Sequence, residues 1–217
     1  MIDTFSLSNY SYFLLDYDGL IVDSEKLYYE TWSKLLTKKG QVICKKFHHG
    51  KHESEVYKEV KEYLKKSLSL KEISTQRQSL FDQFVSQGRL ELLDGIKELL
   101  NVLNNIAPMS IVSNSTVGIV KNGLKSMGIE KYFENLFCFN DKINRKPAPD
   151  LYNLALSTLK LKYYSTLALE DSSTGIMAAQ SSRIPVICIN SNPEMKEFCQ
   201  RHKVRYYKVA KEILSVS

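Results

Sequence analysis

Short runs of bulky apolar residues stand near the beginning of the chain and recur through its second half. Each run is four or five residues long, which is typical of a strand buried on both faces of a parallel sheet. The runs cover residues 12–15, 108–112, 136–139, 166–169, 185–189 and 204–207. The pattern therefore predicts strands at these six places.

Between these runs, apolar residues recur at the three- and four-residue spacing of an amphipathic helix. One such stretch carries Ile96, Leu99 and Leu103, and another carries Val117 and Val120. Strands that alternate with single helices are typical of βαβ units and a parallel sheet. The chain is therefore expected to have an α/β fold, with a Rossmann-like parallel sheet and helices on both faces.

Residues 25–90 differ from the rest of the chain because they show helical spacing and no strand pattern. Tyr28 and Trp32 begin one apolar helix face, and Gly40 is expected to end that helix. The pattern predicts an all-helical domain at 25–90, inserted after the first strand. Residues 1–24 and 91–217 together form the expected core domain.

Polar groups follow several of the predicted strands. They are Asp16 and Asp18, Ser113 and Asn114, Lys146 in a following loop, and Glu170 with Asp171. Parallel strands end at one edge of a sheet, where α/β proteins bind ligands, so these groups can converge there. Taken singly, each has a plainer explanation as a helix cap or a surface charge.

The converging set suits one kind of chemistry. Carboxylate oxygens are the ligands that Mg²⁺ prefers, and protein-bound Mg²⁺ commonly contacts a phosphate. A lysine and a cation neutralise charge on a transferring phosphoryl group, and an aspartate can accept that group covalently. The sequence therefore predicts metal-assisted phosphoryl transfer through an aspartyl-phosphate.

Charge and cysteine content narrow the expected partners. The net charge is +6, but the lysines are spread along amphipathic stretches, so nucleic acid is not an expected partner. The four cysteines lack C-x-x-C spacing, which favours free thiols. No apolar run reaches the ~20 residues of a membrane span, and the first residues lack a signal-peptide pattern. A cytoplasmic protein without a membrane partner is expected.

The polar strand ends resemble the four ordered motifs of the haloacid dehalogenase-like superfamily, in its branch of small phosphatases and β-phosphoglucomutase. The matching segments are 16–24 (Asp-Tyr-Asp-Gly-Leu-Ile-Val-Asp-Ser), 113–115 (Ser-Asn-Ser), 146–152 (Lys-Pro-Ala-Pro-Asp-Leu-Tyr) and 169–175 (Leu-Glu-Asp-Ser-Ser-Thr-Gly). The resemblance spans essentially the whole chain. It implies a catalytic core domain and a helical cap domain at 25–90 that closes over the site.

The resemblance also implies a role for each polar residue. Asp16 would be the nucleophile and Asp18 the general acid and base, and an acid at position 18 argues against a dehalogenase. The expected cofactor, Mg²⁺, would be held by Asp16, the backbone carbonyl of Asp18 and Asp171, with Glu170 among the ligands or just outside them. The phosphoryl group would be bound by Ser113, Asn114 and Lys146.

The expected reaction is hydrolysis of a small phosphorylated metabolite, a sugar phosphate or a nucleoside monophosphate, by a monomeric enzyme. A phosphomutase of the β-phosphoglucomutase kind is the alternative, because the core motifs serve both reactions. His49, Gly50 and Lys51 are expected to contact the substrate, and His49 falls where mutase-like members carry a lysine. A non-catalytic binding protein with a basic surface is the remaining alternative, against which the intact set of acids argues.

Overall fold

The computed structural model describes residues 5–47 and 53–214, and the chain divides into two compact units. One unit consists of Met1–Val22 and Leu92–Ser217, and the other is Asp23–Glu91. Val22 and Leu92 pair in an isolated antiparallel bridge, and the Asp23 N–H donates to the Glu91 carbonyl at 3.1 Å. The two points at which the chain passes from one unit to the other are therefore tied to each other.

A six-stranded parallel sheet forms the first unit, in the order β3-β2-β1-β4-β5-β6. Its strands are β1 (Tyr12–Leu15), β2 (Met109–Thr116), β3 (Leu136–Phe139), β4 (Thr166–Glu170), β5 (Val186–Ile189) and β6 (Arg205–Tyr207). All six predicted strands are present, and the Rossmann-like α/β fold is confirmed. Only β2 differs clearly from its prediction, because it continues through the polar triplet that was expected to follow it.

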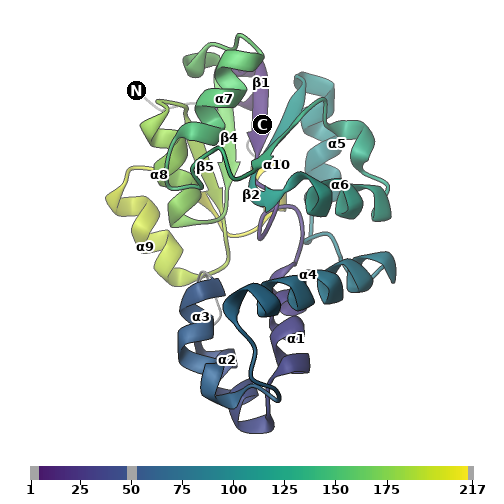
Figure 1. The fold of residues 1–217 in the computed structure, drawn as a ribbon. Coiled ribbons are helices and arrows are strands. Elements are labelled where there is room, and N and C mark those ends of the chain that lie inside the picture. Colours follow the sequence, from purple (N-terminus) through teal and green to yellow (C-terminus); the bar gives the residue numbers. More distant parts are fainter. Residues whose placement is uncertain (1–4, 48–52, 215–217) are drawn as a thin grey trace. The chain divides into compact units, whose positions relative to one another are not determined.

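Helices cover both faces of this sheet. They are α5 (Ile96–Ile106), α6 (Val117–Ser126), α7 (Asp150–Thr158), α8 (Ser173–Ser181), α9 (Pro193–Arg201) and α10 (Ala210–Leu214), with 3-10 turns η1 (Leu7–Asn9), η3 (Glu130–Tyr132) and η4 (Tyr163–Ser165). In Figure 1, α5 and α6 lie on one side of the sheet, and α8 and α9 lie on the other. Helix α7 packs against α8, and α10 packs against α5.

The central strand β1 positions the site. It lies between β2 and β4, and all of its side chains are buried, as a strand covered on both faces requires. Leu15 aligns with Ile111 of β2 and with Leu169 of β4. Because the strands are parallel, the residues after Leu15 and Leu169 emerge at the same edge of the sheet.

The second unit contains the helices α1 (Glu25–Leu35), α2 (Lys38–Phe47), α3 (Glu53–Val60) and α4 (Leu70–Ser86), with the 3-10 turn η2 (Lys61–Tyr63). Among its described residues there is no strand. Trp32, Val56 and Ile73 come from three of these helices and share one buried core. Across residues 5–47 and 53–214, no helix has both the length and the apolar character needed to cross a membrane.

Gly40 does not end the first helix, so that prediction is wrong. Helix α1 ends at Leu35, Leu36 has an extended backbone, and Gly40 lies inside α2. A Cβ at Gly40 would stand 2.6 Å from the Cβ of Tyr63 and 3.2 Å from that of Leu36. The glycine is explained by close packing against η2 rather than by helix termination.

Arg77 of α4 is a buried cation within the helical unit, and only 8% of it is exposed. Its guanidinium pairs with Glu53, donates to Thr31 Oγ1 at 2.9 Å and lies 4.2 Å from the centroid of the Trp32 ring. Burial lowers the pKa of Arg77, and the nearby charge of Glu53 opposes this effect. These contacts tie α4 to α1 and to the first residue of α3.

Candidate active site

Asp16 is the first residue after β1. Its N–H donates to the Leu169 carbonyl at 3.0 Å, which extends the pairing of β1 with β4 by one residue. Beyond it the chain turns sharply, because the N–H groups of Ile21 and Val22 both donate to the Tyr17 carbonyl, at 3.0 and 3.2 Å. The Asp16 side chain is therefore held at the carboxyl edge of the sheet, with a tight turn directly behind it.

Gly19 brings this turn against the next strand. Its φ is +81°, a left-handed conformation that favours glycine. A Cβ at this position would also collide with the carboxylate of Asp171. The glycine of the first motif is therefore required both by the turn and by the close approach of the fourth motif.

Lys146 is a buried cation in the middle of the site. Its Nζ donates to Asp16 Oδ1 at 2.7 Å, to Glu170 Oε1 at 2.5 Å and to the Val112 carbonyl at 2.7 Å. Burial alone would lower the pKa of Lys146, but the charges of Asp16 and Glu170 outweigh burial and raise it. The lysine therefore stays protonated and holds together carboxylates from two strand ends.

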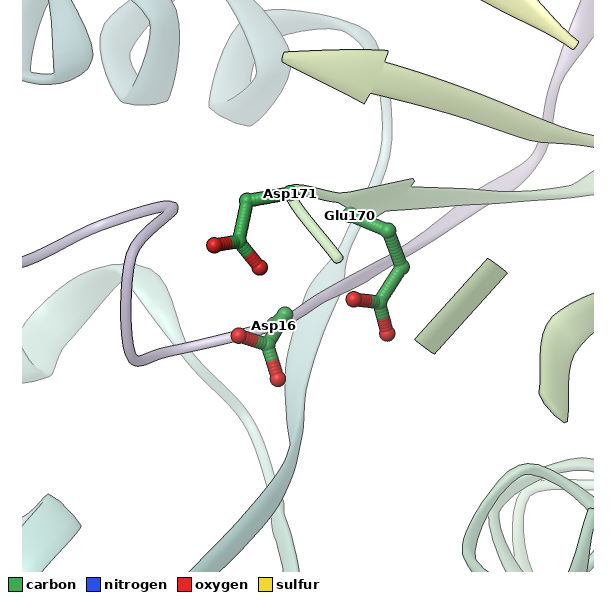
Figure 2. A group of neighbouring side chains, drawn as sticks. All are labelled: Asp16, Glu170 and Asp171. Carbon is green, nitrogen blue, oxygen red and sulfur yellow. The ribbon is translucent and has the colours of Figure 1, made fainter. Parts of the chain in front are cut away.

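Three carboxylates form a cluster that could hold a metal ion. One oxygen each from Asp16, Glu170 and Asp171 lies within 4.8 Å of the others. Figure 2 shows them converging, with Asp16 from the end of β1 and the other two from the end of β4. Burial raises the pKa of Asp171, and the charges of Asp16 and Glu170 raise it further. Burial also raises the pKa of Glu170 to about 7, against the lowering effect of Lys146.

The surroundings of the Glu170 carboxylate show whether a cation would fit the acidic cluster. Its Oε1 accepts from Lys146 and from the Tyr152 hydroxyl, at 2.5 and 2.6 Å. Its Oε2 is buried and has no hydrogen-bond partner among the described residues, and a Cβ at Gly175 would overlap the carboxylate. A buried oxygen without a donor is costly, as is the repulsion among three close carboxylates. A hard divalent cation would relieve both penalties, so the donor set fits one.

A bulge in β2 supplies the polar groups on the other side of Asp16. The register between β2 and β3 shifts between Ser113 and Thr116, which leaves Asn114 and Ser115 outside the regular ladder. Bulges of this kind redirect side chains and are frequent beside active sites. Here the bulge directs Asn114 toward the loop of Lys146 and Ser115 toward the turn of Asp18.

Asn114 is directed at the loop that carries Lys146. Its Oδ1 accepts from the Lys146 N–H at 2.8 Å, and its Nδ2 donates to the Lys146 carbonyl at 3.2 Å. Arg145 donates in turn to the Asn114 carbonyl at 2.5 Å and lies 3.4 Å from the centroid of the Phe139 ring. The Asn114 amide thus fixes the backbone of Lys146.

Ser113 and Ser115 complete this side of the site. Ser113 is fully buried, and its Oγ accepts from the Ser115 N–H at 2.9 Å. The Ser115 hydroxyl donates to Asp18 Oδ2 at 2.6 Å. The carboxylate of Asp18 is therefore directed at the bulge, and it is not part of the acidic cluster. The family resemblance implies that only the backbone carbonyl of Asp18 would contact the metal.

The structure brings the residues predicted from the strand ends into one region. Those in direct contact or in the acidic cluster are Asp16, Lys146, Glu170 and Asp171, and those bonded around them are Ser113, Asn114 and Asp18. Their chemical roles stay predictions. The predicted substrate residues His49, Gly50 and Lys51 lie outside the described residues.

Sequence reasoning gave no individual role to Ser115, Tyr152 and Gly175. Each lies inside a quoted motif, which was the available signal. Tyr152 belongs to the third motif, and its hydroxyl donates to Glu170 Oε1. Gly175 lies in the fourth motif, and its lack of a Cβ makes room for the Glu170 carboxylate.

Comparison with known proteins decides the family. Residues 13–189 match the sequence profile described as Haloacid dehalogenase-like hydrolase. The chain belongs to this family. Its predicted membership and its predicted class, a hydrolase of the phosphatase kind, are confirmed at that level.

Two relatives and one solved structure illustrate the likeness. A "Phosphorylated carbohydrates phosphatase" of Thermotoga maritima is 26% identical over 79% of this chain and 81% of its own. "Putative phosphatase YhcW" of Bacillus subtilis is 25% identical over 81% of each. The crystal structure of a "putative beta-phosphoglucomutase" from Thermotoga maritima has a TM-score of 0.73 at 23% identity, over 95% of this chain and 97% of that one. This last likeness concerns the fold alone.

Proposed function

We propose that this protein is a Mg²⁺-dependent phosphatase that hydrolyses a small phosphorylated metabolite through a phosphoryl group carried on Asp16. The observation that supports this most is the contact between Asp16 Oδ1 and the buried cation Lys146, inside a cluster of three carboxylates. A fixed cation and a potential cation site on the same carboxylate are what a phosphoryl acceptor requires, because both offset the charge of the incoming group.

In the first step, an Asp16 oxygen attacks phosphorus as the ester P–O bond breaks. Asp18 gives its proton to the departing alcohol oxygen. In the second step, water attacks the same phosphorus and gives a proton to Asp18, as the bond between phosphorus and Asp16 breaks. The products are the alcohol and inorganic phosphate, and both aspartates return to their starting states.

Lys146 and Ser113 are assigned to the phosphoryl oxygens, and Asn114 acts through its two hydrogen bonds to the Lys146 backbone.

Mg²⁺ would be held by Asp16, Glu170, Asp171 and the Asp18 carbonyl. When bound, the cation supplies positive charge to the phosphoryl oxygens and orients them. The helical unit remains the predicted cap that selects the substrate.

A sugar phosphate or a nucleoside monophosphate is the proposed substrate. The name of the Thermotoga maritima phosphatase, which refers to phosphorylated carbohydrates, supports the first of these classes. Phosphate release from a panel of phosphorylated sugars and nucleotides, each at a fixed Mg²⁺ concentration, would rank the candidates. A panel on which no member releases phosphate would count against the proposal.

The decisive experiment compares wild type, Asp16→Asn and the matched surface variant Asp141→Asn on p-nitrophenyl phosphate. Asp141 is exposed and lies in a loop outside the cluster. Asp16→Asn and wild type with EDTA are expected to lose nearly all turnover, whereas Asp141→Asn keeps it. A phospho-aspartate trapped at residue 16 and detected by mass spectrometry would support the intermediate. Turnover retained by Asp16→Asn would exclude it.

A phosphomutase remains the second candidate, because Asp16 and Asp18 could return the phosphoryl group to a sugar instead of water. Incubation with β-glucose 1-phosphate separates the two reactions. Free phosphate indicates the phosphatase, and an isomeric sugar phosphate without phosphate release indicates the mutase.

A further inference from the structure

Ser115 makes a contact for which the proposed function has no role. Its hydroxyl donates to Asp18 Oδ2 at 2.6 Å. The two residues come from different elements, since Ser115 lies near the end of β2 and Asp18 lies in the turn after β1. Nothing local in the sequence requires them to meet.

We propose that Ser115 is a positioning residue for Asp18, and that the β2 bulge exists in part to aim it. This inference rests on the proposed function, in which Asp18 transfers the proton. Both carboxylate oxygens of an aspartate can carry a proton, and rotation about its last torsion exchanges them. The Ser115 bond engages Oδ2 and restrains that torsion, which holds the carboxylate in one orientation for proton transfer.

The serine is itself held in place. Its N–H donates to Ser113 Oγ at 2.9 Å, and its backbone lies at the register shift between β2 and β3. Asn114, the other residue of the bulge, is bonded to the Lys146 backbone through both amide atoms. A hydroxyl on such a fixed backbone can orient a neighbouring carboxylate, which a hydroxyl on a mobile loop cannot.

The effect of misplacing Asp18 should depend on the leaving group of the ester. An alkyl phosphate needs a proton on its departing oxygen, whereas dinitrophenolate is a weak base and departs without one. The parameter kcat/KM reports the steps up to transfer onto Asp16, in which Asp18 acts as the acid. Misplacement of Asp18 therefore lowers kcat/KM for the alkyl ester and spares it for dinitrophenyl phosphate.

The test measures kcat/KM for glucose 6-phosphate and dinitrophenyl phosphate in wild type, Ser115→Ala and Ser115→Thr. Ser115→Ala is expected to lose about tenfold on the sugar phosphate and less than about twofold on the aryl ester. Ser115→Thr keeps the hydroxyl and restores the sugar phosphate rate to within about threefold of wild type. Ser126→Ala is the matched control, because that serine is exposed and donates to the Gly123 carbonyl of its own helix.

The results distinguish the role of Ser115 from the phosphatase function on which it rests. Equal losses on both esters, or no loss on either, would overturn the role of Ser115 while leaving the phosphatase intact. Wild type that cleaves neither ester would overturn the proposed function, and the inference with it. If Ser115→Ala does not fold, Ser115→Cys, whose thiol is a weak donor, is expected to show the same selectivity. Circular dichroism and the melting temperature verify the fold of each variant.

Discussion

The ammonium of Lys146 lies 2.5 Å from Glu170 Oε1, and both side chains are buried, at 2% and 0% exposure. Each partner stabilises the charge of the other where water cannot. Breaking such a pair by removing one partner typically costs about 3–5 kcal/mol, because the remaining charge is uncompensated. This contact therefore contributes to folding as well as to the proposed chemistry.

The first prediction follows from that contact. Lys146→Met is expected to lower the free energy of unfolding of the metal-free protein by about 3 kcal/mol or more, and to abolish turnover. Urea unfolding monitored by circular dichroism measures the loss. Lys121→Met, on the exposed face of α6, is the control and should change stability by less than about 0.5 kcal/mol. A Lys146→Met protein as stable as this control would contradict the prediction.

The second prediction uses two glycines that share a backbone conformation. Gly19 and Gly128 have φ values of +81° and +66°, but only a Cβ at Gly19 meets another group, the Asp171 carboxylate. Both alanine variants should lose about 1 kcal/mol from the strained backbone. Mg²⁺ is expected to raise the melting temperature of wild type, and Gly19→Ala should in addition lose most of this rise, whereas Gly128→Ala should keep it. Equal Mg²⁺ responses in the two variants would argue against a cation beside Asp171.

The third prediction concerns pH. Burial raises the pKa of Glu170 to about 7, so the folded metal-free protein holds a proton that the unfolded chain releases near its ordinary pKa of 4.5. The unfolded state then binds fewer protons, and stability falls as pH rises through this interval. A cation binds the deprotonated carboxylates, so its affinity rises over the same interval. The Mg²⁺-induced rise in melting temperature is expected to grow from about pH 6 to about pH 8. A Mg²⁺ effect that is constant across this range would be inconsistent with a proton held by Glu170.

The fourth prediction compares two arginines of the helical unit. Arg77 is buried and pairs with Glu53, whereas the Arg89 side chain, 36% exposed, pairs with Glu30. Replacing Arg77 by Met should cost about 2–4 kcal/mol, because the partly buried carboxylate of Glu53 loses its cationic partner. Replacing Arg89 by Met should cost less than about 1 kcal/mol, as for most exposed ion pairs. Differential scanning calorimetry of both variants measures the two costs, and a reversed order would refute the comparison.

The sequence predicted best those elements whose local residue pattern is set by their position in the fold. A strand buried on both faces must be apolar throughout, so 12–15 and 166–169 could be recognised without knowledge of their neighbours. The acids that follow them could be placed at one edge because parallel strands share their polarity. That reasoning located Asp16 and Asp171 correctly in space, although it could give neither their hydrogen bonds nor their pKa shifts.

The features that the sequence could not predict depend on contacts between segments that are distant along the chain. Gly40 has the sequence signature of a helix end, but its reason is the Cβ of Tyr63 in another element. Tyr152 fits an apolar helix face, and only the fold shows that its hydroxyl reaches Glu170. Ser115 is aimed by a register shift between β2 and β3, and no periodicity in either strand encodes such a shift.

The bridge between Val22 and Leu92 has a consequence for how this chain can change. Because the ends of the 23–91 segment are tied together at its base, the pairing of β1 with β2 does not depend on how many residues the segment contains. Lengthening a closed loop costs only about 0.6 kcal/mol for each doubling. The helical segment is therefore expected to tolerate replacement. Transplanting a helical segment of a related hydrolase between Val22 and Leu92 should preserve the sheet register and the Lys146–Glu170 pair, and under the proposed cap role of this segment it should change the substrate preference.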